Sequence, residues 1–343
     1  MSLVVSEQKI LKEKDNNDSH QIEIEYYKGH QFSKNLLREI RALQEKNNWY
    51  NFFSLALDWL LIAMAIVITQ VYSNIIVYIL SIILIGGRMR GLDNLMHESS
   101  HKMLFKNQTL NKWMASIFIA LPVATNYNSY CSSHYKHHKY LWTDEDPDTS
   151  ELKRLGLGSN AITKRQFVLR YIFGSFLIKH IIKNIIDCIT RLVSKDQQTN
   201  FEYFIKLSGW IIIVSVSVLF NFWQELLLFW FVPLVTVFPI IRFWSDLADH
   251  SGLEDSNPFH SSRNNYGSWL ERLILTSHHD NYHIAHHLFP AIPHFNLKKA
   301  HIMLLKHPQY AKASHCTGFF NTFLPGFKSV ISDVVRKMNK NRY

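Results

Sequence analysis

Nine histidines fall into short segments whose spacing suits metal binding. Residues at i, i+3 and i+4 share one face of a helix, so an HxxHH segment can direct two or three imidazoles at one point. Neutral imidazole suits iron, copper, zinc and nickel, whereas calcium and magnesium require oxygen ligands. Nine ligands exceed the roughly six that one such ion holds, so the pattern predicts two ions with open positions. The segments HESSH, HYKHH, SDLADH and HIAHH contain His97, His101, His134, His137, His138, His250, His283, His286 and His287.

Two other interpretations of these residues use fewer of them. HESSH also matches HExxH, the zinc-protease signature in which Glu98 would be the base, but this leaves both HxxHH segments without a role. A histidine-rich metal carrier is a third, non-enzymatic interpretation. Soluble di-iron bundles use glutamates with paired ExxH motifs, and Glu98 to His101 is the only ExxH here. The oxidative two-metal site is therefore the main hypothesis.

The elements that must position these histidines include four apolar runs. Each approaches the roughly 17–25 residues that cross a bilayer, although the mean hydropathy of the whole chain is only −0.07. The runs come in two close pairs, and Asp58 within the first should face the bundle interior. The predicted fold is an all-α membrane protein with four transmembrane helices in two hairpins and a cytosolic histidine-rich helical cap. The predicted spans are residues 52–69, 72–87, 208–222 and 226–241.

Charge predicts the orientation. Neither hairpin connector contains Lys or Arg, so the positive-inside rule places both termini and all the histidine segments in the cytoplasm. The net charge of +10 suits a face resting on anionic lipid, and no nucleic-acid-binding module is recognisable. Residues 167–186 alternate basic and apolar positions, which predicts one amphipathic helix lying on the membrane.

The motifs resemble those of the integral-membrane fatty acid desaturase and hydroxylase family. HYKHHKYLWTDEDPD is similar to its second histidine box with the acidic turn that follows, and NYHIAHHLFPAIPHFNL is similar to its third box. The resemblance covers about residues 59–301. It implies two iron ions, dioxygen as co-substrate and the nine histidines as metal ligands.

Two carboxylates are candidates for supporting roles. His250 resembles the family's extra ligand after the fourth span, and an asparagine four residues earlier contributes through water in related acyl-CoA desaturases. That position is Asp246 here, for which direct iron binding and a salt bridge to Arg242 are both open. Glu98 could form a hydrogen bond to a ligand histidine. No catalytic residue beyond the metal ligands is predicted.

The predicted function is O2-dependent desaturation of a fatty acyl chain in lipid metabolism, with a hydroxylase of a lipid or specialised metabolite as the alternative. The chain contains no HPGG-type haem motif, dinucleotide fingerprint or cysteine set for an iron–sulfur cluster. We therefore expect an external donor, a ferredoxin or a cytochrome with its reductase. An acyl lipid, acyl carrier or acyl-CoA would be the substrate, in a multi-pass protein of the bacterial inner membrane. The expected parts are a polar cytosolic N-terminal arm (1–48), a membrane desaturase-like domain (49–310) and a basic C-terminal tail (311–343).

Overall fold

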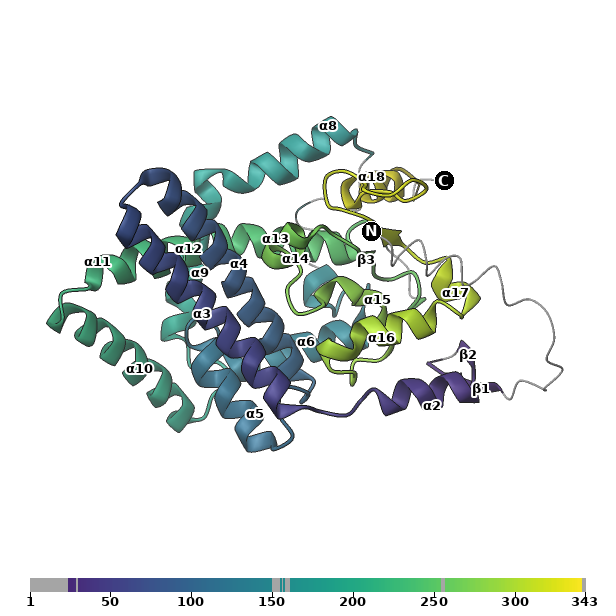
Figure 1. Ribbon diagram of the computed structural model, residues 1–343, viewed down its shortest axis with the longest axis horizontal. Coiled ribbons are helices and arrows are strands. Elements are labelled where there is room, and N and C mark those ends of the chain that lie inside the picture. The colour runs from purple at the N-terminus through teal and green to yellow at the C-terminus, as the bar shows by residue number, and fades with distance from the viewer. Residues whose placement is uncertain are drawn as a thin grey trace.

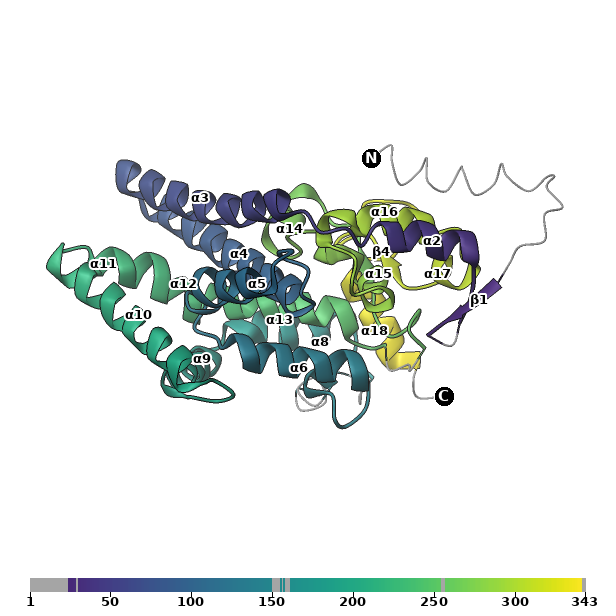
Figure 2. The same cartoon turned by 90° about the horizontal axis from the view of Figure 1, so that it is seen from below.

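The computed structural model describes residues 24–28, 30–149, 155, 157, 161–253 and 257–340, and these are mostly helical. The first 23 residues of the predicted N-terminal arm lie outside the described residues. The long apolar helices extend toward one end of the molecule, and the shorter elements gather at the other (Figures 1 and 2). The predicted helical, membrane-type fold is confirmed at this level; the hairpin topology and the cytosolic cap stay predictions.

Within the described residues, four helical segments are long and apolar enough to cross a membrane. They are α3 (Asn48–Tyr72), α4 (Ile75–Ser100), α10 (Asn200–Leu219) and a fourth segment, Trp223–His250. The fourth segment consists of α11 (Trp223–Leu226), the π-helical turn η4 (Leu227–Phe231), α12 (Val232–Val235) and α13 (Val237–His250).

The helices continue past the apolar runs that predict the membrane spans, and the bounds of the spans themselves stay predictions. The second run was expected to end at residue 87, yet α4 continues to Ser100. The added turns contain Arg88, Arg90 and Asp93, which end an apolar run in the sequence but are buried and ion-paired in the fold. A hydropathy pattern cannot identify polar residues that face a protein interior.

Capping residues define the turn between α3 and α4. Ser73 ends α3 in the left-handed conformation with φ 44°, and the side chain of Asn74 accepts a hydrogen bond from the amide of Ile76. Gly86 allows α4 to approach α13 closely, since a Cβ there would lie 2.6 Å from Val237 Cγ1. The two helices therefore pack tightly about three turns before His97 on α4 and His250 on α13.

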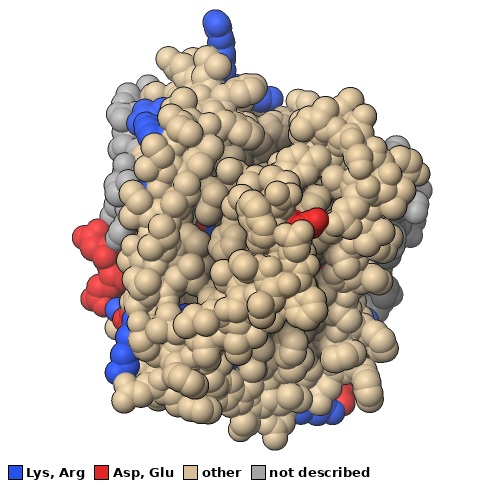
Figure 3. All heavy atoms as spheres, turned by 90° about the vertical axis from the view of Figure 1, so that its left-hand side faces the viewer, with Lys and Arg blue, Asp and Glu red and all other residues tan. Residues whose placement is uncertain are grey.

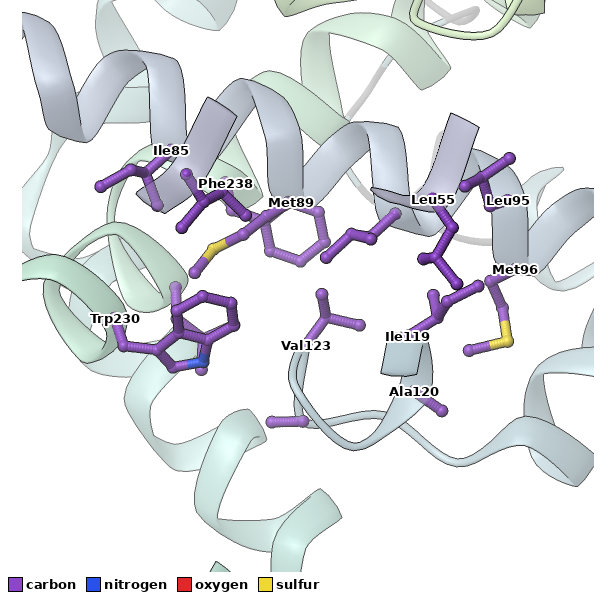
Figure 4. Packing of buried hydrophobic residues seen from close by; sticks show 14 of the residues in the cluster. Leu55, Ile85, Met89, Leu95, Met96, Ile119, Ala120, Val123, Trp230 and Phe238 are labelled. Carbon is purple, nitrogen blue, oxygen red and sulfur yellow. The ribbon is translucent and has the colours of Figure 1, made fainter. Parts of the chain in front are cut away.

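Apolar side chains from the long helices form the core that holds these histidines in place. Leu55 of α3, Met89 of α4 and Trp230 of η4 belong to one buried cluster, part of which is shown in Figure 4. The Trp230 indole stacks on Trp59, with ring centroids 5.3 Å apart, and donates a hydrogen bond to the carbonyl of Pro122. This joins α3, η4 and the short segment after α5 (Gln108–Ala115) and η1 (Ser116–Ala120).

Asp58 faces the bundle interior, as expected. Its side chain is fully buried and lies 2.8 Å from Arg88 Nη1 and 2.7 Å from His278 Nε2. Arg88 also donates to Ser277 Oγ over 2.6 Å. A buried charge is tolerated when it is paired and hydrogen-bonded, and this network ties α3 and α4 to the segment before the third histidine group.

The predicted single helix over residues 167–186 was wrong. The chain instead forms α8 (Lys164–Phe167), η2 (Val168–Ile172) and η3 (Phe173–Phe176), and then α9 (Ile178–Val193). Leu177 is extended, with ψ 137°, and Gly174 in the preceding turn is a poor helix former. Exposed isoleucines lie along α9, and Figure 3 shows few charged side chains on the end of the molecule that the long helices form. Both features suit contact with lipid.

The remaining elements either contain histidine segments, as α6 and α15 do, or surround them. They are β1 (Ile24–Tyr27), β2 (His30–Ser33), α2 (Lys34–Ala42), α6 (Tyr127–Tyr140), β3 (Asn264–Asn265), α14 (Trp269–Ile274), η5 (Asp280–Tyr282), α15 (His283–Leu288), α16 (His294–Leu304), α17 (Pro308–Ala311), β4 (His315–Cys316) and α18 (Val330–Lys340). β1 pairs antiparallel with β2, and β3 pairs parallel with β4. β4 and α18 lie in the predicted tail yet bury Cys316, Val330 and Ile331. The predicted domain boundaries stay predictions.

Candidate metal centre

Four helix ends bring the nine histidines together near the middle of the molecule. α4 and α13 end at this point, and α6 and α15 lie beside them (Figures 1 and 2). α6 begins at Tyr127, and the side chain of the capping residue Asn126 accepts hydrogen bonds from the amides of Asn128 and Ser129. The ring nitrogens form two groups, in each of which the candidate ligand atoms lie within 4.8 Å of one another. The groups are His97, His101, His134, His138 and His286, and His137, His250, His283 and His287.

The nitrogens within each group are spaced like ligands around an ion. In the group of five, Nε2 of His286 lies 2.8 Å from that of His97 and 3.1 Å from that of His138. In the group of four, Nε2 of His283 lies 2.9 Å from that of His250 and 3.0 Å from that of His287. An ion with bonds of roughly 2.1 Å to nitrogen holds neighbouring ligands at right angles about 3 Å apart. The spacing therefore fits a metal ion in each group.

Hydrogen bonding between the rings does not account for this arrangement. His250 Nδ1 lies 3.1 Å from the carbonyl oxygen of Ser261, so it must donate, and a neutral ring then has only a lone pair at Nε2. A proton on His283 Nε2 can satisfy His250, but His287 Nε2 faces the same nitrogen. A cation between the three nitrogens would accept all three lone pairs.

Burial keeps most of these rings neutral, which is the form that binds metal. It lowers the pKa of His101 to about 4, and it lowers the pKa of His134 and His286 well below the ordinary value. His137 differs. Burial would lower its pKa, but the hydrogen bond to Asp146 and the charge of Asp148 outweigh burial and raise it.

A carboxylate and a carbonyl hold the outer nitrogens of two rings, whereas the carboxylate of Asp280 lies 3.8 Å from His283 Nδ1, too far for a hydrogen bond. Asp146 Oδ1 accepts from His137 Nδ1 over 3.1 Å, and the carbonyl oxygen of Ser261 accepts from His250 Nδ1. Such partners fix the orientation of a ligand imidazole. Sequence reasoning did not assign these roles. The acidic turn after HYKHH was a signal for Asp146, whereas Asp280 has no motif of its own.

Neither of the two predicted supporting carboxylates accepts a hydrogen bond from one of the nine rings within the part of the chain that the structure describes. Glu98 is buried, and its Oε1 accepts from the amide of His294 rather than from a ring nitrogen of the nine histidines. Among the described residues, neither Glu98 nor Asp246 belongs to a group of candidate ligand atoms. Asp246 Oδ2 lies 3.8 Å from Arg242 Nε, which agrees with the salt-bridge alternative.

Comparisons with known proteins identify the class. The family model "Fatty acid desaturase" matches residues 73–317, and the chain belongs to this family. The protein is therefore a fatty acid desaturase-like oxidoreductase of the membrane. It is similar to dihydrorhizobitoxine desaturase of Bradyrhizobium elkanii, with 30% identity over 338 residues that cover 95% of each chain.

Proposed function

We propose that this enzyme uses dioxygen to oxidise an unactivated C–H bond, with desaturation as the outcome, at two iron ions held by the nine histidines. The observation that carries the proposal is the division of the converging imidazoles into groups of five and four with metal-like nitrogen spacing. If each ion takes about six ligands, the first keeps about one open position and the second about two. Open positions are typical of catalytic rather than structural metals.

The residues of this chain hold and orient the centre. When bound, the two irons would supply the activation of dioxygen. Five of the nine rings are buried, and these are His137, His250, His283, His286 and His287, whereas the other four are half-buried. Asp146 holds His137 in one orientation, and the carbonyl of Ser261 does the same for His250.

The electron balance requires an external donor. Desaturation removes two hydrogen atoms from adjacent carbons, and two electrons and two protons from the donor then complete the reduction of one dioxygen to two waters. We propose a ferredoxin, or a cytochrome with its reductase, as this donor. Turnover of the purified protein with reduced nicotinamide alone would contradict this assignment.

Desaturation is favoured over hydroxylation because the family and the similar protein are both named for it. A fatty acyl chain on a lipid, carrier protein or coenzyme A is the substrate that the family name suggests. The similar protein is named for dihydrorhizobitoxine, so substrates within the family differ. We further propose a cytoplasmic active site and residence in a bacterial inner membrane, supported by four membrane-capable helices and a net charge of +10.

The test compares His137→Ala with wild-type protein purified from membranes. We expect wild type to contain about two irons and to consume oxygen when donor and substrate are present. His137→Ala should reach the membrane but lose iron and turnover. His260→Ala is the matched control, since His260 belongs to neither group of candidate ligands. A lone zinc in active wild type, or full turnover by His137→Ala, would refute the proposal.

A further inference from the structure

A cavity of about 130 Å³ opens beside the histidine groups, and its lining is charged. Of its sixteen lining residues, two are arginines and five are aspartates, whereas only Leu155 and Phe243 are purely hydrocarbon. Small-molecule sites are usually lined mainly by apolar side chains with a few polar groups. The charged lining therefore restricts the class of molecule that the cavity can bind.

One of the two arginines is held by the protein through both of its terminal nitrogens. Arg90 is buried, and its guanidinium donates to Asp93 over 2.8 Å and to Asp280 over 3.0 Å. It also donates to Ser245 Oγ over 3.1 Å. Arg90 thus holds the wall of the cavity together and leaves little capacity for a ligand.

The other arginine is different. Among the described residues, the ion pairs of Arg242 run from Nε to Asp93 at 3.7 Å and to Asp246 at 3.8 Å, both longer than a hydrogen bond. The side chain of Arg242 is 38% exposed. A guanidinium has five donors in a planar fork that suits a carboxylate. The Arg242 guanidinium can therefore donate two hydrogen bonds to the carboxylate of a ligand.

Asp246 supplies the opposite charge next to Arg242. Its side chain is 51% exposed, and its ion pairs, 3.8 Å to Arg242 and 3.9 Å to Arg90, are also longer than hydrogen bonds. Arg242 and Asp246 are one turn apart on α13. By helix geometry Asp246 lies about 6 Å along the axis from His250, and Arg242 about 12 Å. A molecule held by this pair would extend its carbon chain toward the histidines.

An uncharged hydrocarbon chain would fit poorly in this position. It would displace water from Arg242 and Asp246 and give neither a partner, and a charged group without a partner is costly to bury. A ligand with its own carboxylate and ammonium close together would instead pair with both groups.

We propose that the cavity binds a small zwitterion, with the α-carboxylate on Arg242 and the α-ammonium on Asp246, and that this molecule is the substrate. The inference rests on the proposed oxidation and specifies its substrate class, an α-amino acid with a short side chain. A zwitterionic lipid headgroup has similar chemistry, but the two hydrocarbon residues of the lining give its acyl chains little apolar wall.

The test measures binding to the resting, iron-containing protein without an electron donor, so that no turnover occurs. The probe is radiolabelled norleucine (2-aminohexanoate) in equilibrium dialysis. The competitors are hexanoate, which lacks the ammonium, hexylamine, which lacks the carboxylate, and lysophosphatidylethanolamine. The variants are Arg242→Gln and Asp246→Asn, and the control is Arg165→Gln, because Arg165 is exposed on α8 and does not line the cavity.

We expect norleucine to bind wild type about 10- to 100-fold more tightly than either single-charge analogue, because each loses a charge-assisted contact. Arg242→Gln should weaken norleucine binding by a similar factor but leave the binding of hexylamine, which has no carboxylate, unchanged. Asp246→Asn should likewise weaken norleucine binding but leave the binding of hexanoate, which has no ammonium, unchanged. If a variant fails to fold, the comparison of the three ligands on wild type still decides the question.

Three results would overturn the inference: no saturable norleucine binding, equal binding of the single-charge analogues, or stronger competition by the lipid than by unlabelled norleucine. None of these would affect the proposed oxidation, because iron content and oxygen uptake in the His137→Ala experiment are measured separately.

Discussion

Replacing Asp146 with asparagine should weaken metal binding although Asp146 belongs to neither of the two histidine groups. The side chain is fully buried and accepts four hydrogen bonds. They come from His137 Nδ1 at 3.1 Å, Thr149 Oγ1 at 2.6 Å and the amides of Asp148 and Trp142 at 3.0 and 3.3 Å. Burial would raise the pKa of Asp146, but the hydrogen bond from His137 and the other hydrogen bonds outweigh it and lower the pKa. The group is therefore a carboxylate at neutral pH.

Asparagine keeps the volume but removes the charge and presents N–H groups where acceptors are needed. Loss of such a partner typically reduces metal affinity about 10- to 100-fold, or about 1.4–2.7 kcal/mol. The assay is retention of iron by purified protein against increasing chelator, together with the unfolding temperature. Asp148→Asn should have a smaller effect, since Asp148 is 57% exposed and lies 3.3 Å from the same nitrogen.

Glu145→Gln is the matched control, because Glu145 is exposed in the same turn. The reasoning fails if Asp146→Asn keeps its iron as well as Glu145→Gln does. It also fails if the loss of iron follows only from a general loss of folding.

Two further predictions concern stability. Asp58→Asn should lower the free energy of unfolding by about 3–5 kcal/mol, because it leaves Arg88 buried without its counter-charge. Asp187→Asn, in an exposed ion pair, should lower it by at most about 1 kcal/mol. Unfolding of the purified variants measures the difference, and equal losses would refute the prediction. Burial lowers the pKa of His315 from 6.5 to about 4, so its stabilising contribution is complete above pH 6.5 and declines toward pH 4 by about 1.4 kcal/mol per unit. His315→Gln should therefore lose less stability than wild type between pH 7 and 5, and identical losses would contradict the assignment.

The sequence predicts the positions of the long apolar helices but not the residues at which they end. Clean apolar runs identified all four membrane-capable segments. Hydropathy could not extend α4 through Arg90 and Asp93, because their burial depends on partners such as Asp280, almost two hundred residues away. The break at Leu177 was missed for a similar reason. Charge alternation predicts amphipathicity but says nothing about where a helix must bend to pack.

The histidines were predictable as a set because ligand spacing on a helix is a local property. Their division into groups of five and four was not, since HYKHH contributes His134 and His138 to one group and His137 to the other. Three histidines at i, i+3 and i+4 of one helix can bind at two sites only when the partner helices define both sites. Arg242 and Asp246 were recognised as a possible pair from their i, i+4 spacing, but their exposure to a cavity required the fold.

Charge balance links the metal centre to the substrate cavity. Neutral imidazoles bring no counter-charge for two cations, so nearby carboxylates such as Asp146 and Asp280 must offset them. Arg90 already pairs with Asp93 and Asp280, and Arg242 stands beside Asp246 at the cavity. A lone carboxylate or a lone ammonium would disturb this balance within a low-dielectric site. A zwitterion brings both charges at once and leaves the net charge unchanged, and this is the physical reason that the cavity should discriminate against its single-charge analogues.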